Sequence, residues 1–99
     1  MTSIMSTPSP DIFEDNISIL LADDHPLVQD GIRTRFEEID DISVIGIACN
    51  GEELLNKAAV LKPDVVITDI SMPKIGGLEA TRLLTKNHPG IKVLILTMH

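Results

Sequence analysis

The sequence predicts an α/β domain in which helices cover both faces of a parallel sheet. Four short runs rich in Ile, Leu and Val alternate with three stretches whose apolar residues recur at helical spacing. Parallel strands require long crossover connections, and each stretch between two runs is long enough to form one that contains a helix. The chain is therefore expected to alternate as βαβαβαβ, with right-handed connections and a doubly wound arrangement.

Composition indicates a single globular domain and argues against several classes of protein. The chain has 99 residues, of which 43% are hydrophobic and 23% are charged, and its net charge is −7. An acidic chain repels phosphate backbones, and there is no Tyr or Trp for base stacking, so we expect no direct nucleic-acid contact. No apolar run approaches the roughly 20 residues of a membrane span. With one cysteine, Cys49, and no Lys or Arg before Arg33, we expect a cytoplasmic protein without a disulfide, signal peptide or membrane partner.

The N-terminal part of the chain is predicted to hold a leader, a strand and a helix. Residues 1–16 mix Ser, Thr and Pro with acidic residues and predict a flexible leader before a domain at residues 17–99. Residues 17–22 form an apolar run suited to a strand buried on both faces. Pro26 is well placed as the first residue of a helix, and His25 before it is expected to cap that helix rather than bind a metal. The apolar stripe of this helix comprises Val28, Ile32, Phe36 and Ile39.

Two further helices and three further strands complete the alternation. The strands are predicted at residues 43–48, 64–69 and 91–97. Asn50-Gly51 turns the chain into the second helix, Pro63 stops that helix, and a loop with Gly76-Gly77 precedes the third. The apolar positions of these two helices are Leu54, Leu55, Ala58, Ala59 and Leu61, and then Ala80, Leu83 and Leu84.

Polar side chains gather at the predicted carboxyl edge of the sheet. Asp23 and Asp24 follow the first strand, Asp69 ends the third, and Thr97 ends the fourth. If the first and third strands are neighbours, the three carboxylates meet, and like charges that close recruit a cation or shift a pKa. Carboxylate oxygens suit Mg²⁺, and a carboxylate beside Mg²⁺ can act as a nucleophile toward phosphorus. A lone Asp-Asp pair is more often a turn or helix cap, but the combined arrangement favours a functional site.

Three motifs resemble those of a known family. They are LLADDHP at 20–26, VVITDISMPKIGGLE at 65–79 and VLILT at 93–97. Together they resemble the receiver domain of response regulators (CheY-like), and the Asp-Asp-His-Pro opening and Leu-Thr-Met-His ending are similar to its NarL/LuxR-type subfamily. The resemblance covers residues 17–99. It implies a flavodoxin-like, doubly wound parallel sheet with the strand order 2-1-3-4-5.

The resemblance implies roles for five residues. Asp69 would accept a phosphoryl group from a sensor histidine kinase or phosphotransfer protein, for signalling rather than as an enzyme with metabolic turnover. Mg²⁺ would be held by Asp24, by Asp69, by Asp23 directly or through water, and by the backbone carbonyl of Ser71. Thr97 matches the switch hydroxyl. Because a DNA-binding helix-turn-helix domain usually follows in this subfamily, the parent protein is expected to regulate transcription.

The chain departs from the family pattern after its fourth strand. The resemblance implies a further helix, strand and helix, and a lysine at the end of the fifth strand that pairs with the phosphoryl group. Lys74, in the loop after Asp69, is expected to be solvated instead. We therefore expect a C-terminally truncated receiver with uncovered apolar sheet surface. Its fourth strand would be an apolar edge, open to homodimer or strand-edge association.

Two alternative functions stay open beside signalling through Asp69. The first is a phosphorylation-defective receiver fragment that acts as a kinase-binding or dimerising interaction module, and the missing lysine motivates it. The second is a phosphohydrolase with an aspartyl nucleophile. That class normally has a second acid two residues after the nucleophile, where this chain has Ser71, so it is the weaker alternative.

Overall fold

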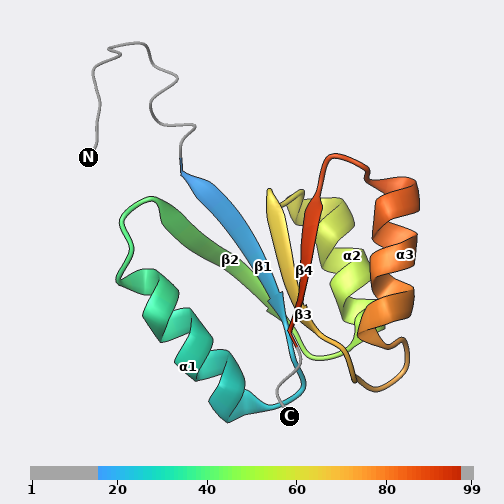
Figure 1. The fold of residues 1–99 in the computed structure, drawn as a ribbon, viewed down its shortest axis with the longest axis horizontal. Helices are drawn as coiled ribbons and strands as arrows, with labels where there is room; N and C mark the ends of the chain where they lie inside the picture. The colour runs from blue at the N-terminus through green and yellow to red at the C-terminus, as the bar shows by residue number, and fades with distance from the viewer. Residues whose placement is uncertain (1–15, 97–99) are drawn as a thin grey trace.

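The computed structural model describes residues 16–96 as one parallel sheet flanked by three helices (Figure 1). The elements are β1 (Ile17–Ala22), α1 (Pro26–Glu37), β2 (Ile42–Ala48), α2 (Gly51–Leu61), β3 (Val65–Asp69), α3 (Gly77–Asn87) and β4 (Lys92–Leu96). The strands lie in the order β2-β1-β3-β4, and every neighbouring pair is parallel. α1 covers one face, while α2 and α3 cover the other. The predicted βαβαβαβ fold is therefore confirmed, with the first and third strands as neighbours.

The two termini of the chain carry predictions that fall outside this description. Of the predicted leader, only Asn16 lies within the described residues, where its Oδ1 accepts a hydrogen bond of 3.0 Å from Ser43 Oγ. Thr97 also lies outside them. None of the helices in residues 16–96 has the length and apolar character needed to cross a membrane.

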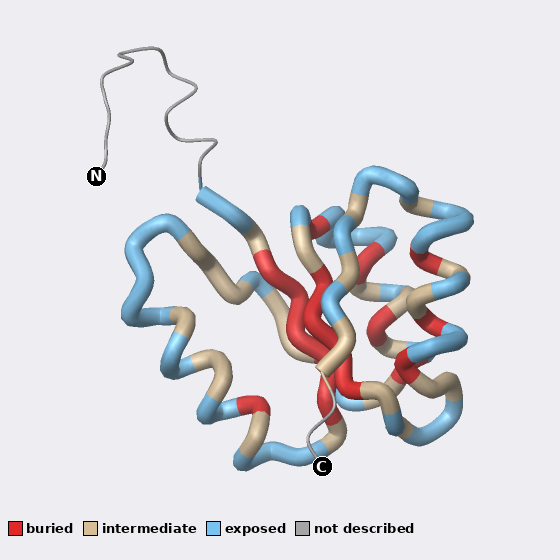
Figure 2. The backbone as a smooth tube through the Cα atoms, viewed as in Figure 1, coloured by how far each residue is buried: buried red, intermediate tan, exposed pale blue. Residues whose placement is uncertain are grey.

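The core has two layers because the central strands are buried on both faces (Figure 2). Side chains alternate along a strand, so Leu20 packs against the layer of α2 and α3, whereas Ile19 and Leu21 pack toward α1. The layer under α2 and α3 is the larger, with eight buried residues against three under α1. The continuous apolar run of β1 reflects this burial on both sides.

Some residues of the predicted helical stripes lie outside the core. α1 ends at Glu37, so Ile39 lies in the following turn, where it is 45% exposed and its N–H donates to Phe36 O. Ala59 and Leu61 of α2 are also exposed, because only Leu54 and Ala58 share the buried face of this helix with Gly51 at its start. The predicted stripe was therefore wrong at Ile39, whereas Ala59 and Leu61 lie within the second helix as predicted. Apolar residues at the flank or end of a helix fit the periodic pattern without reaching the sheet.

Asn50 caps α2, and its removal is expected to destabilise the protein. Its Oδ1 accepts a hydrogen bond of 2.8 Å from Glu53 N, and Glu53 Oε1 in turn accepts one of 2.6 Å from Cys49 N. Asn50→Ala should lower the free energy of unfolding by about 1 kcal/mol, because the first helical turn loses an acceptor. Urea denaturation would measure the change. Asn56→Ala, at an exposed position within the same helix, is the control and should cause no loss.

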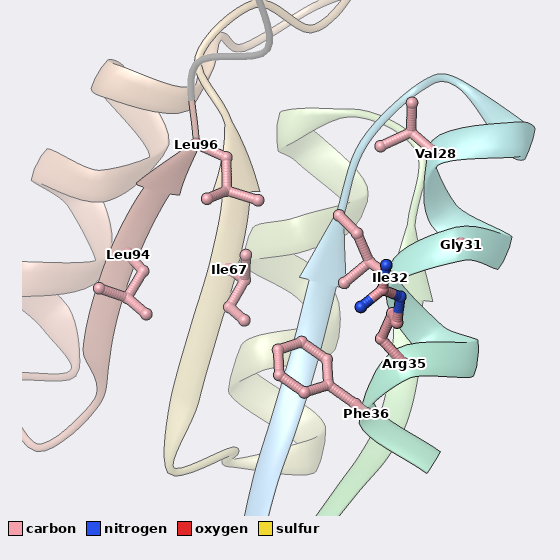
Figure 3. A pocket seen from close by; sticks show the side chains of 8 residues that line it. All are labelled: Val28, Gly31, Ile32, Arg35, Phe36, Ile67, Leu94 and Leu96. Carbon is pink, nitrogen blue, oxygen red and sulfur yellow. The ribbon is translucent and has the colours of Figure 1, made fainter. Parts of the chain in front are cut away.

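An apolar groove lies between α1 and the outer half of the sheet (Figure 3). Its volume is about 580 Å³, and its lining residues are Val28, Gly31, Ile32, Arg35, Phe36, Ile67, Leu94 and Leu96. Leu94 is 57% exposed, and β4 pairs only with β3 among the described residues. This face therefore has the uncovered apolar surface and the open strand edge that the sequence predicted.

Candidate functional site

The sheet topology brings Asp23, Asp24 and Asp69 together. In the parallel pairing of β1 with β3, Ala22 lies opposite Thr68, so the next residues along the two strands are Asp23 and Asp69. One side-chain ligand atom from each of the three aspartates and from His25 lies within 4.8 Å of the others. The edge formed by the carboxyl ends of β1 and β3 is thus the candidate site.

Asp23 is the most tightly held of these carboxylates. The residue is 2% exposed, and its Oδ1 accepts a hydrogen bond of 2.8 Å from His25 N. Its own N–H donates to Ala48 O at 3.0 Å, which continues the ladder between β1 and β2 by one residue. The backbone that carries the Asp23 side chain is therefore held in place by a hydrogen bond to β2.

Asp24 carries an unsatisfied oxygen that faces the other carboxylates. Oδ1 of Asp24 is buried and makes no hydrogen bond within residues 16–96, although it lies 2.9 Å from His25 Nδ1. Burying a charged oxygen without a hydrogen bond is unfavourable, and the one positive group near it among the described residues is the exposed ring of His25. Hard carboxylate oxygens are the ligands that Mg²⁺ prefers. These residues consequently fit a divalent cation.

Asp69 is buried at the end of β3, with one oxygen engaged. It is 5% exposed, and Ile70 N donates to its Oδ1 at 2.7 Å. Within the described part of the chain, Oδ2 of Asp69 accepts no hydrogen bond. One oxygen thus orients the carboxylate while the other is available for bond formation.

His25 lies in the acidic cluster, where sequence reasoning expected a helix cap. It does occupy the N-cap position of α1, but its side chain makes no cap hydrogen bond. The ring Nδ1 lies 3.0 Å from Asp23 Oδ1 instead. The hydrogen bond to Asp23 and then the charge of Asp24 raise the pKa of His25 above its usual value. When protonated, the ring supplies positive charge to the carboxylates. Because its side chain is 64% exposed, it can move away without disturbing the core.

The loop after β3 folds back tightly on Asp69. Gly77 N donates to Ile70 O at 2.9 Å, and a Cβ atom at Gly77 would collide with the backbone carbonyl of Asp69. Gly76 has ordinary space around it, so Gly77 is the glycine that the close approach requires. Ser71 lies in this loop as an exposed residue.

Lys74 does not reach the carboxylates. Its backbone is left-handed, with φ of 67°, and its ammonium group lies 3.1 Å from Glu52 Oε1 on the surface. Within residues 16–96, no lysine forms an ion pair with the three aspartates. The expectation that Lys74 is a solvated loop residue is confirmed.

Sequence reasoning missed Gln29 of α1. This residue is 9% exposed, and its Nε2 donates a hydrogen bond to the backbone carbonyl of Asp23. Its position was the available signal, because Gln29 precedes Ile32 of the apolar stripe by three residues and therefore flanks the buried face. A polar side chain at such a position requires a buried partner.

Comparisons with known proteins point to one family. The response regulator receiver domain family matches residues 19–99. Over 82 residues, the chain is 54% identical to the response regulator GacA of Pseudomonas viridiflava, an alignment that covers 83% of this chain and 38% of that protein. It is 46% identical over 83 residues to the response regulator UvrY of Escherichia coli (strain K12), covering 84% of this chain and 38% of that one. The chain thus spans less than half the length of these relatives.

Solved structures give the same result. A LuxR-family two-component response regulator from Aurantimonas sp. SI85-9A1 superposes with a TM-score of 0.80 at 34% identity, covering 85% of this chain and 60% of that one. A second match is the isolated REC domain of RcsB from Salmonella enterica serovar Typhimurium in the presence of phosphomimetic BeF3−. It has a TM-score of 0.80 at 33% identity, and the alignment covers 85% of this chain and 63% of that one. With its parallel strand order, its aspartate-lined edge and these matches, the chain belongs to the response regulator receiver domain family and has its CheY-like flavodoxin fold.

Proposed function

We propose that this chain receives a phosphoryl group on Asp69 from a sensor histidine kinase or a phosphotransfer protein, in the cytoplasm and with Mg²⁺. One observation carries the proposal. Asp69 has one oxygen held by Ile70 N–H and the other available, beside the carboxylates of Asp23 and Asp24. A nucleophile and a cation-binding pair at one sheet edge is the combination that phosphoryl transfer to a carboxylate needs.

Each residue of the site has a separate proposed role in this transfer. Asp69 Oδ2 forms the new O–P bond while the bond from phosphorus to the donor breaks, and the donor group leaves with the bonding electron pair. Ile70 N–H holds the other oxygen and so fixes the line of attack. Asp23, Asp24, Asp69 and the Ser71 carbonyl would hold Mg²⁺, which when bound neutralises charge on the transferring group. The proposed role of Thr97 is to hydrogen-bond the phosphoryl oxygens after transfer.

The relatives support a role in gene regulation for a longer protein that contains this domain. One matching structure shows RcsB bound to promoter rprA in the presence of phosphomimetic BeF3−. We propose that phosphorylation of Asp69 likewise acts as the switch of a transcriptional regulator. Net charge of −7 argues against direct contact between this segment and DNA.

Acetyl phosphate tests the proposed transfer directly. The chain is incubated with acetyl phosphate with and without Mg²⁺, and its intact mass is followed with time. We expect a single phosphoryl adduct that requires Mg²⁺, with acetate as the leaving group. Trapping with borohydride and peptide mapping should place the adduct on Asp69. Absence of an adduct at saturating Mg²⁺ would overturn the proposal, and steady release of phosphate from phosphomonoesters would indicate a phosphohydrolase.

A second candidate function is a receiver that binds a kinase without being phosphorylated. The observation that favours it is the position of Lys74 on Glu52, which leaves the three aspartates without a lysine partner in the described residues. In the experiment above, this function predicts no adduct together with retained binding to a histidine kinase. An adduct on Asp69 would exclude it.

We also expect the chain to self-associate through β4 and the adjoining apolar groove. Light scattering after size exclusion should give a mass that rises with concentration above the 10.8 kDa of one chain. Leu94→Lys should reduce association, because it places a charge on the exposed edge strand. Val60→Lys, at an 80% exposed residue of α2, is the control and should leave association unchanged. A monomer at every concentration would contradict this expectation.

A further inference from the structure

One polar side chain is buried where α1 meets the end of β1. Gln29 is the one buried residue of α1, since the apolar residues of its stripe are only half-buried. Its Nε2 donates a hydrogen bond to Asp23 O and lies 3.6 Å from Cys49 Sγ. A carboxamide is costly to bury unless its N–H groups find acceptors. These two acceptors therefore account for a polar residue at this position.

The hydrogen bond from Gln29 completes the backbone contacts of Asp23. On one side, the Asp23 N–H donates to Ala48 O at 3.0 Å. On the other, the Asp23 carbonyl accepts from Gln29 and from no other group within residues 16–96. Strand pairing ends at this residue, so the carbonyl has no ladder partner and would be an unsatisfied buried acceptor without Gln29. The bond to Ala48 holds the peptide that precedes Asp23, and the bond from Gln29 holds the peptide that joins Asp23 to Asp24.

The direction of that peptide determines where both carboxylates point. Asp23 and Asp24 lie on either side of it, and their oxygens lie within 4.8 Å of each other and of Asp69. A net change of the backbone torsion angles on either side of this peptide would turn one Cα–Cβ bond relative to the other and change the spacing of the carboxylate oxygens. Small Mg²⁺ demands nearly ideal positions of its ligands, so its affinity is sensitive to such a change.

We infer that Gln29 is a positioning residue for the divalent-cation site, which it controls through the backbone carbonyl of Asp23. This inference rests on the proposed role of Asp23 and Asp24 as Mg²⁺ ligands. Gln29 acts from behind Asp23 and contacts neither the carboxylate oxygens nor a reacting atom. Groups that orient metal ligands in this way typically change metal affinity by about 10–100-fold when they are removed.

The variant Gln29→Met tests the inference, because methionine has a similar length and volume but no N–H donor. Since the chain has no Trp, Mg²⁺ binding is best followed by amide chemical shifts in a titration of the whole chain. We expect the Kd for Mg²⁺ to rise about tenfold. At saturating Mg²⁺, the rate of phosphorylation by acetyl phosphate should return to that of the wild type. A residue needed only for folding would not produce this separation of affinity from rate.

Leu84→Val is the matched control. It removes one methylene from a fully buried side chain of α3, so it lowers stability without touching the β1–α1 loop. Its Mg²⁺ affinity should equal that of the wild type. A second readout needs no metal: amide hydrogen exchange at Asp24 and His25 should be faster in Gln29→Met but not in Leu84→Val.

The outcomes separate the role of Gln29 from the proposed function. If the wild type binds Mg²⁺ and Gln29→Met binds it equally well, the positioning role is overturned while the metal site stands. If the wild type binds no Mg²⁺, the metal site itself fails, and the role of Gln29 in it fails too. Gln29→Asn, which keeps the carboxamide but is one methylene shorter, should weaken Mg²⁺ binding in the same way and carries the test if Gln29→Met does not fold.

Discussion

Replacing Asp69 by Asn is expected to abolish the phosphoryl adduct with acetyl phosphate. A carboxamide oxygen is a far weaker nucleophile than a carboxylate oxygen, so no acyl phosphate forms. The fold should be retained, because the Asn side-chain oxygen can still accept the hydrogen bond from Ile70 N–H. Thermal unfolding should occur at the same or a higher temperature, since the substitution removes one of three like charges at the sheet edge. Intact mass and circular dichroism together measure both effects.

Asp30→Asn is the control for this prediction. Asp30 is an exposed residue of α1 that lies 3.3 Å from Arg33, away from the three carboxylates. This variant makes the same chemical change elsewhere on the chain and should be phosphorylated like the wild type. An adduct of undiminished yield in Asp69→Asn would show that another side chain is the acceptor.

Replacing Gly77 by Ala is expected to lower the stability of the protein strongly. The new methyl group would overlap the backbone carbonyl of Asp69, and a backbone atom cannot move aside like the end of a flexible side chain. Relief requires α3 and the end of β3 to separate, at a cost of about 3 kcal/mol in the free energy of unfolding. Displacement of Asp69 by about 1 Å would also slow phosphorylation by about 100-fold. Urea denaturation and adduct formation measure the two losses.

Gly31→Ala tests whether the effect comes from close approach rather than from any change of glycine to alanine. Gly31 lies within α1, and no atom lies within 4 Å of the position that its Cβ would occupy. Because alanine favours helix, this variant should be as stable as the wild type or more stable by about 0.5–1 kcal/mol. Equal stability of the Gly77 and Gly31 variants would contradict the packing that places Gly77 against Asp69.

Much of the fold could be predicted because its signals are local. The apolar run at residues 17–22 is β1, and Pro26 begins α1. Leu20 and Leu21 are both buried, as expected for a strand between two layers of helices. Periodicity was less informative at the ends of helices, as Ile39 and Leu61 show. The pattern records which residues are apolar but not how far the sheet extends beneath them.

The site could be predicted in part for a similar reason. Asp23, Asp24 and Asp69 lie at the carboxyl ends of their strands, and the carboxyl ends of parallel strands share one edge of the sheet. The side-chain position of His25 was not predictable, because the residue can cap its helix or turn to the acidic pair. The carboxylates of Asp23 and Asp24 attract its ring, and the sequence does not show which of these two local interactions the side chain makes.

The sequence by itself determined the order of elements, the parallel sheet and the aspartates at its edge, because these depend on local periodicity and on where each strand ends. Only the tertiary structure decided the rest. The hydrogen bond from Gln29 to Asp23 O and the packing of Gly77 on Asp69 join residues of different elements, and their geometry exists only in the packed chain. The physical reason is that the energetic effect of a buried polar group or of a missing Cβ depends on the atoms packed around it. Folding brings those atoms together from distant parts of the sequence.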